Sequence, residues 1–152
     1  MRTLLALATL LAMPASGFAS GGLSCEVDDD VLKLEVQSGV TRGMGSPVFN
    51  FGAKAEILDT KAPVHLRSVE FGASNLPQYW LDQTTLNLLL YRETEDDLPH
   101  GYVEITIQAQ PRADEDGVYS GAFSMTVYDV GAAASAEPLR IEHAGEVSCF
   151  VE

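Results

Sequence analysis

The residues with the most specific chemistry in this sequence are its two cysteines. Cys25 and Cys149 stand near opposite ends of the chain, and two cysteines allow a single intramolecular pairing. They do not form a C-x-x-C pair, the spacing typical of redox catalysis. In an oxidising compartment paired cysteines persist as disulfides. We therefore expect a structural Cys25–Cys149 disulfide.

Signatures of catalysis or metal binding are missing from the sequence. It contains no G-x-S-x-G nucleophile elbow, no H-E-x-x-H and no phosphate loop ending in GK[ST]. Residues 114–117 begin like a calcium loop, but Met125 stands at the twelfth position, where a bidentate Glu is required. The segment is better interpreted as a hairpin turn. We expect no enzyme activity, no cofactor and no metal.

The three histidines are scattered and lack cysteine partners, which makes a zinc site a poor interpretation. His65 and His100 stand next to loops or on polar faces. His143 shares the parity of the apolar residues around it. We interpret it as a core histidine with a satisfied hydrogen bond, or as one turned outward by a bulge near Gly145.

Two segments offer candidate partner-binding residues. Tyr79 and Trp80 follow a loop rich in turn formers, and an aromatic pair there either anchors a partner or caps the core. Arg42 and Met44 lie in the glycine-rich stretch 39–50, from which both side chains would protrude. Loops on rigid β scaffolds often bind in this way.

The first 19 residues have the features of a secretory signal peptide. Arg2 precedes an uncharged apolar run over 4–13, and Gly17-Phe18-Ala19 is a small-x-small cleavage site. A lipoprotein signal ending at Cys25 is the alternative, and it would leave Cys149 unpaired. We expect residues 1–19 to be the leader and 20–152 a single acidic domain, periplasmic or secreted.

The net charge of the chain limits the classes of molecule that it can bind. The formal net charge is −13 at pH 7, so the domain repels nucleic acid and anionic lipid surfaces. No apolar run approaches the roughly 20 residues that a membrane span needs. A basic envelope or extracellular protein is the partner that the charge favours. The sequence leaves the oligomeric state open.

Apolar residues alternate with polar ones in most of the domain, which indicates half-buried antiparallel strands. This period-two pattern covers 32–37, 49–57, 103–110 and 119–127. Segment 64–71 changes parity midway, as a β-bulge would. Segment 84–91 is apolar on both faces, which predicts a central strand or one covered by a loop or a partner.

The two terminal strands carry the cysteines on their apolar faces. Leu23, Cys25 and Val27 share one parity, and Cys149 shares the parity of Val147 and Val151. We therefore expect a buried disulfide between the first and last strands. The fold class is all-β, an antiparallel sandwich of about seven to eight strands, with an up-and-down β-barrel as the alternative.

A binding or inhibitory module of the bacterial cell envelope fits these features. In layout the chain resembles the bacterial periplasmic lysozyme inhibitors: a leader, short strands and a cysteine near the end. Ser120-Gly121-Ala122-Phe123 is similar to the serine–glycine loop of the invertebrate-type lysozyme inhibitors. The tyrosine expected shortly afterwards is absent, and the segment has the alternation of a strand. This resemblance does not identify a family.

Two further functions stay open. A barrel interior could carry a small apolar ligand, unless side chains such as Phe51, Phe123 and Met125 fill it. Alternatively, the chain is a structural subunit of an envelope assembly, with the doubly apolar segment 86–91 as its interface.

Overall fold

The computed structural model describes residues 20–41, 48–95, 97–131 and 137–152. These residues form nine antiparallel strands and two short 3₁₀ helices. The strands are β1 (Ser20–Asp28), β2 (Leu32–Thr41), β3 (Val48–Ile57), β4 (Ser68–Phe71), β5 (Gln78–Leu81), β6 (Leu86–Glu93), β7 (Gly101–Pro111), β8 (Val118–Asp129) and β9 (Leu139–Val151). The 3₁₀ helices are η1 (Val64–Leu66) and η2 (Ala73–Asn75).

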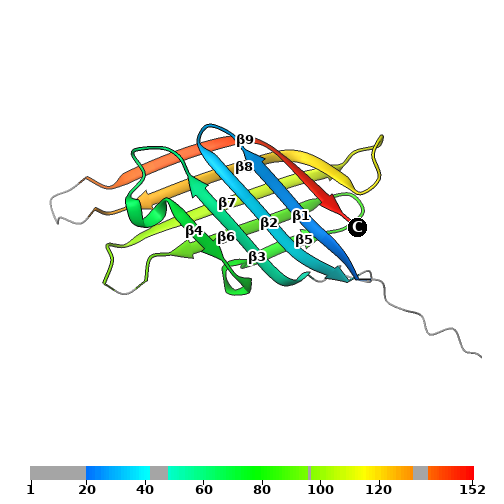
Figure 1. The fold of residues 1–152 in the computed structure, drawn as a ribbon, viewed down its shortest axis with the longest axis horizontal. Helices are drawn as coiled ribbons and strands as arrows, with labels where there is room; N and C mark the ends of the chain where they lie inside the picture. Colours follow the sequence, from blue (N-terminus) through cyan, green and yellow to red (C-terminus); the bar gives the residue numbers. More distant parts are fainter. Residues whose placement is uncertain (1–19, 42–47, 96, 132–136) are drawn as a thin grey trace, which may run out of the picture.

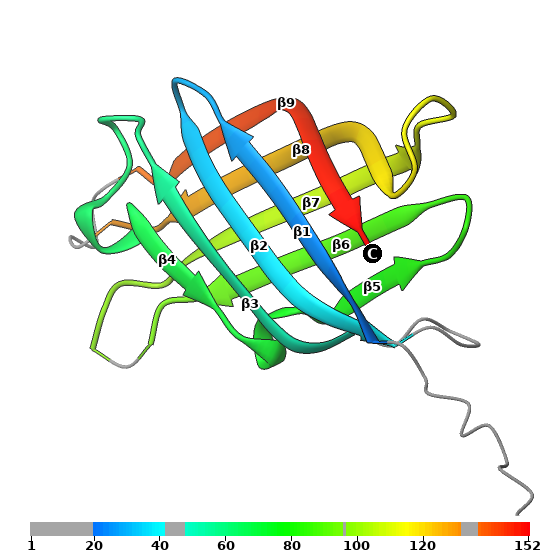
Figure 2. The same ribbon diagram turned by 45° about the vertical axis from the view of Figure 1, so that its right-hand side comes forward.

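All nine strands belong to one sheet, in the order β4-β3-β2-β1-β9-β8-β7-β6-β5. Each strand pairs with its neighbour in sequence, except that β4 and β5 are the two edges and β1 pairs with β9. The sheet curls into a half-barrel in which β2 and β3 cross in front of β6 and β7 (Figures 1 and 2). The all-β antiparallel class is confirmed. The two-sheet sandwich of seven to eight strands is not, and the strand order is that of an up-and-down meander.

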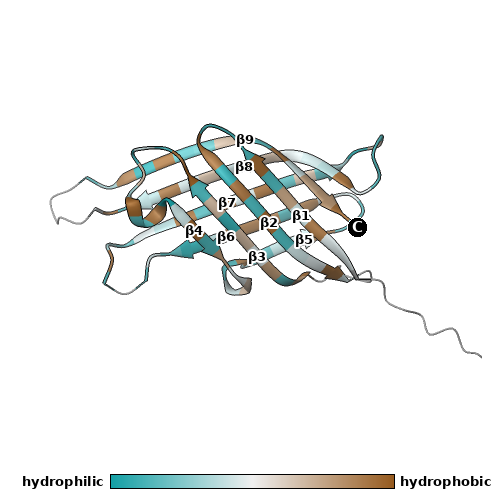
Figure 3. Cartoon of the chain, viewed as in Figure 1, coloured by the Kyte–Doolittle hydropathy of each residue, from teal (hydrophilic) through white to brown (hydrophobic). Residues whose placement is uncertain are grey.

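The concave face of the curl holds the core. Along most strands hydrophobic residues alternate with hydrophilic ones (Figure 3). The hydrophobic set is buried. Phe123 and Met125 are almost fully buried, and Phe51 is 8 % exposed. Side chains therefore fill the interior between the front and back halves of the curl.

The disulfide joins the first strand to the last. Cys25 and Cys149 are directly opposite each other in the β1–β9 register, with their Cα atoms 4.0 Å apart. Both side chains are buried on the concave face. The predicted pairing and the predicted parity are confirmed. The bridge crosses the pairing between the first described strand and the last.

Segment 64–71 is not one bulged strand. Its first part is the 3₁₀ helix η1, and β4 starts at Ser68. The change of parity comes from the turn of η1 rather than from an inserted residue. A register shift does occur elsewhere, between β2 and β3, where Asn50 has a φ of 50°.

Strand β6 is not central, because only β5 lies beyond it. Leu86, Leu88 and Leu90 are buried on the concave face. Leu89 and Tyr91 point to the convex face and are half-buried. The pattern that predicted two buried faces thus reflects one buried face and one partly covered face.

The two ends of the half-barrel differ. At one end, here called the η1 end, lie η1, the β1–β2 turn, the end of β6, the start of β7, the end of β8 and the start of β9 (Figure 1). At the other end, here called the mouth, lie the β5–β6 turn, the β7–β8 hairpin and the end of β9. The hairpin turn expected at 114–117 is present.

Candidate functional site

The mouth contains a depression of about 740 Å³. It is bordered by the end of β2, by β5 and its turn, by the β7–β8 hairpin and by the end of β9. The lining residues are Val40, Tyr79, Trp80, Leu81, Asp82, Gln83, Pro111, Arg112, Glu115, Asp116, Gly117, Tyr119, Val151 and Glu152. A volume of this size lies within the range of small-molecule pockets.

Trp80 is the most exposed aromatic side chain that lines the mouth, and its register opposite Asn87 places it on the convex side of β5. It is 61 % exposed, and its indole N–H donates a hydrogen bond to Oδ2 of Asp82 over 2.9 Å. Its neighbour Tyr79 is 39 % exposed and points to the concave side, opposite Leu88. The exposure of Trp80 does not fit the alternative in which it caps the core. An exposed indole with a fixed orientation is a suitable anchor for a partner.

Asp82 organises the turn that holds Trp80. Its Oδ1 accepts hydrogen bonds from the amides of Thr84 and Thr85, at 2.7 and 2.8 Å, and from the Thr84 hydroxyl. This is the Asx-turn pattern, in which a short carboxylate replaces backbone bonds. The hydrogen bonds from Trp80, then from Thr84 and Thr85, hold the pKa of Asp82 well below its usual range.

Tyr119 connects this turn to the sheet. Its hydroxyl donates a hydrogen bond to the carbonyl oxygen of Asp82 over 3.0 Å, and the residue is 8 % exposed. Burial, with the negative charge of Asp82, raises the pKa of Tyr119. In the β8–β9 register Tyr119 lies opposite Cys149. A continuous path therefore runs from the disulfide through Tyr119 and Asp82 to Trp80.

The rim of the mouth is acidic. Four of its lining side chains are carboxylates, from Asp82, Glu115, Asp116 and Glu152, and Arg112 is its one cationic residue. The guanidinium of Arg112 is bound to Asp114 at 2.7 Å and lies 3.7 Å from Glu115. The cation is thus neutralised locally, and the rim keeps a negative balance.

Gly117 fixes the hairpin that carries this rim. Its φ is 76°, a region that side chains disfavour, and an added Cβ would lie 2.7 Å from the carbonyl oxygen of Val151. The amide of Val151 in turn donates to the Gly117 carbonyl over 2.8 Å. The hairpin is held against the end of β9 by this contact.

The structure describes two of the four candidate binding residues that the sequence predicted. Tyr79 and Trp80 lie in the mouth, whereas Arg42 and Met44 fall outside the described residues. Sequence reasoning missed Asp82 and Tyr119. The signal for Asp82 was the Asp82-Gln83-Thr84-Thr85 turn directly after the aromatic pair. Tyr119 had no signal, because its bond to Asp82 spans 37 residues.

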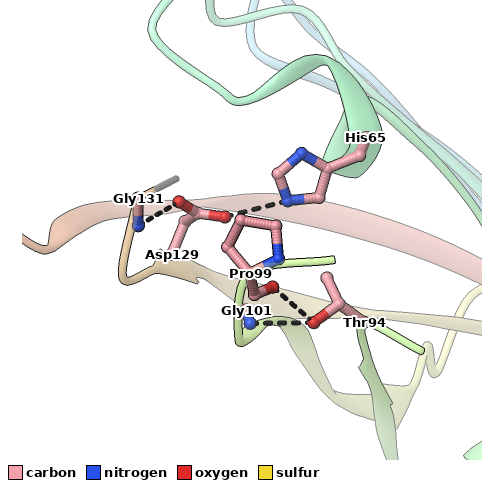
Figure 4. Close-up of polar contacts among 6 residues, drawn as sticks. All are labelled: His65, Thr94, Pro99, Gly101, Asp129 and Gly131. Carbon is pink, nitrogen blue, oxygen red and sulfur yellow. Dashed lines mark hydrogen bonds and ion pairs between the residues drawn. The ribbon is translucent and has the colours of Figure 1, made fainter. Parts of the chain in front are cut away.

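The η1 end holds a second polar cluster, built on Asp129 (Figure 4). Asp129 is 4 % exposed, and its carboxylate is hydrogen-bonded to Nε2 of His65 at 2.8 Å and to the amide of Gly131 at 2.6 Å. Nearby, the Thr94 hydroxyl accepts from the Gly101 amide and donates to the Pro99 carbonyl. The His65 bond attaches η1 to the end of β8, and the Thr94 bonds connect the residue after β6 to the start of β7.

His143 lies on the concave side of β9, as its parity predicted. Its Nε2 lies 2.8 Å from Oδ2 of Asp29, and its ring packs edge-on against Phe123. Burial alone would raise the pKa of Asp29. The hydrogen bonds from His143, Leu32 and Val31 outweigh it and lower that pKa. This is the satisfied histidine of the first interpretation, and β9 runs past Gly145 without a register shift.

A comparison with models of protein families, with curated proteins and with solved structures found no match. Within the described part of the chain, no helix has the length and apolarity needed to cross a membrane. The same residues contain no group of three or more His, Cys, Asp or Glu side chains placed to hold a metal ion.

Proposed function

We propose that this protein is an exported, non-enzymatic module of the bacterial cell envelope that binds or inhibits a basic partner protein through its mouth. The observation that carries the proposal is the position of Trp80. The indole is exposed and held by Asp82 beside a rim of carboxylates, on a chain of net charge −13.

Two physical arguments support this function. Aromatic side chains dominate the binding energy of protein interfaces, and their contribution is largest when little flexibility is lost on binding. The path from Tyr119 through Asp82 keeps Trp80 in one orientation before a partner arrives. The acidic rim and the overall charge attract a cationic surface from a distance, which raises the association rate at low salt.

The test is a pull-down of the oxidised protein against envelope extract at low salt. We expect a basic protein to be captured and to be released as salt rises, because screening weakens the electrostatic attraction. Trp80→Ser should lose the captured protein. Val64→Ser is the matched control, since Val64 is 80 % exposed at the η1 end. Equal capture by both variants would contradict the proposed site.

Carriage of a small apolar ligand is a second candidate, and the size of the depression favours it. Because side chains fill the interior, such a ligand would occupy the mouth, against Tyr79, Leu81 and Val151. A native mass spectrum of the purified protein tests this function. A co-purified apolar molecule would support it, and the bare mass of the chain would contradict it.

A structural role in an envelope assembly is a third candidate. It is favoured by a shallow depression on the convex face, where Trp80 lies near Leu89 and Thr106. Sedimentation at micromolar concentration tests it for self-assembly. A monomeric mass would argue against this role.

A further inference from the structure

The two edge strands of the sheet, β4 and β5, differ in how their outer edges are covered. The edge at β4 is covered: Arg92 donates to the Glu70 carbonyl over 2.5 Å, and Asn75 donates to the Tyr91 carbonyl over 3.1 Å. These bonds connect the β4 side of the opening to β6. The edge at β5 has the sequence Gln78-Tyr79-Trp80-Leu81, without charge or proline. Exposed edge strands normally carry such blocking residues.

The backbone groups that β5 presents outward can be assigned from its pairing. The Asp82 amide donates to the Thr85 carbonyl over 3.0 Å, which makes 82 and 85 a hydrogen-bonded pair. Hydrogen-bonded and non-hydrogen-bonded pairs alternate along an antiparallel ladder. Trp80 and Gln78 therefore bond to β6. The N–H and C=O groups of Tyr79 and Leu81 therefore point away from β6, at the outer edge of the sheet, and both residues also line the depression of the mouth.

We propose that the β5 edge receives an extended, basic segment of the partner as an additional antiparallel or parallel strand. This inference rests on the proposed function and specifies how the partner binds. Strand addition supplies main-chain hydrogen bonds for affinity, while alternate side chains give specificity. The outward groups of Tyr79 and Leu81 supply those bonds.

The surroundings of β5 specify the side chains of the added strand. Those on one face would enter the mouth beside Tyr79 and Leu81, where the carboxylates of Asp116 and Glu152 have no ion-pair partner among the described residues. Lysine or arginine suits those positions. The side chains on the other face would pack beside Trp80 on the convex side, where apolar residues suit.

A second copy of this chain fits the edge poorly. Pairing two β5 strands would bring two acidic rims together on molecules of net charge −13, and like charges at an interface are unfavourable. A basic partner segment has the opposite sign. Charge complementarity therefore selects a basic strand over self-association.

The test uses the oxidised protein and a short synthetic peptide of alternating lysine and valine. The chain contains one tryptophan, so tryptophan fluorescence, excited where tyrosine does not absorb, reports on Trp80 alone. We expect saturable binding and slower hydrogen exchange at the amides of Tyr79 and Leu81. A fully N-methylated peptide of the same sequence keeps the charge but cannot pair, and it should bind at least about tenfold more weakly.

Two further probes separate charge from pairing. The peptide of alternating glutamate and valine should not bind. Asp116→Asn with Glu152→Gln should weaken binding of the lysine peptide, whereas Glu70→Gln at the β4 edge should leave it unchanged.

Equal affinity for the N-methylated peptide would overturn strand addition. Failure of the lysine–valine peptide to bind, while the envelope pull-down still captures a Trp80-dependent protein, would also overturn it and leave the proposed function standing. If neither peptide nor extract protein binds, both proposals fall.

Discussion

The Tyr119 hydroxyl donates a hydrogen bond to the carbonyl of Asp82, so that a buried residue of β8 holds the turn between β5 and β6. The turn belongs to the edge of the sheet, and Tyr119 lies opposite Cys149, one strand away from the disulfide. Trp80 is thereby linked, through Asp82 and Tyr119, to the strand that lies next to the disulfide.

Tyr119→Phe removes only the hydroxyl and leaves the Asp82 carbonyl without this donor. We expect the free energy of unfolding to fall by about 1 kcal/mol and the fluorescence of Trp80 to change, because the turn becomes less restrained. Denaturant unfolding and emission spectra measure the two effects. Tyr128→Phe is the control, because the Tyr128 hydroxyl makes no hydrogen bond to any of the described residues. Equal effects of the two variants would contradict the proposed link.

Asp82→Ala should release Trp80. The indole loses its acceptor and the turn loses the carboxylate that receives the Thr84 and Thr85 amides. We expect lower fluorescence anisotropy of Trp80 at every pH, measured with time resolution. Asp97→Ala, an exposed substitution at the η1 end, should leave the anisotropy unchanged.

The pH dependence of the same signal follows from the lowered pKa of Asp82. Because the folded-state pKa lies below the ordinary value of about 3.9, the carboxylate stabilises the turn above that pH. This contribution is lost as pH falls through the folded-state pKa. The anisotropy of Trp80 should therefore stay constant from neutral pH down to about 4 and drop only in stronger acid. A drop centred near pH 6 would point to a histidine instead.

Removal of the disulfide should destabilise the whole domain. Cys25 and Cys149 are separated by 124 residues, and the chain-entropy model assigns roughly 5 kcal/mol to a closed loop of that length. We expect Cys25→Ala with Cys149→Ala to lower the midpoint of denaturant unfolding, and a reductant to do the same to the native protein. The reductant should have no effect on the double variant. Unchanged midpoints would show that the β1–β9 contact is stable without the bridge.

Asp129→Ala should loosen the η1 end. The substitution leaves the Gly131 amide and His65 without their buried acceptor, a loss of about 1–3 kcal/mol. Asp129→Asn keeps an acceptor oxygen and should cost less. Denaturant unfolding gives the ranking, and hydrogen exchange of residues 64–66 shows whether η1 opens. An unaltered exchange rate in η1 would mean that its other contacts hold it in place.

The alternation of side chains was sufficient to predict the strands and the faces of their residues. Val103, Ile105 and Ile107 face inward because period two has only one solution on a sheet with one wet face. The same parity rule predicted that Cys25 and Cys149 share a buried face. The net charge of −13 is a property of the sequence itself, and export stays a prediction from the first 19 residues.

The strand pairing, the origin of the parity change in 64–71 and the mouth could be determined only from the tertiary structure. A sandwich and a curled meander have the same alternation, so the pairing of β1 with β9 distinguishes them. The parity change in 64–71 could come from a bulge or from a turn of helix, since both shift the pattern by one residue. The mouth depends on bonds such as Tyr119 to Asp82, between residues far apart in the chain. Such contacts follow from how the sheet curls, a property of all nine strands together and not of any one segment.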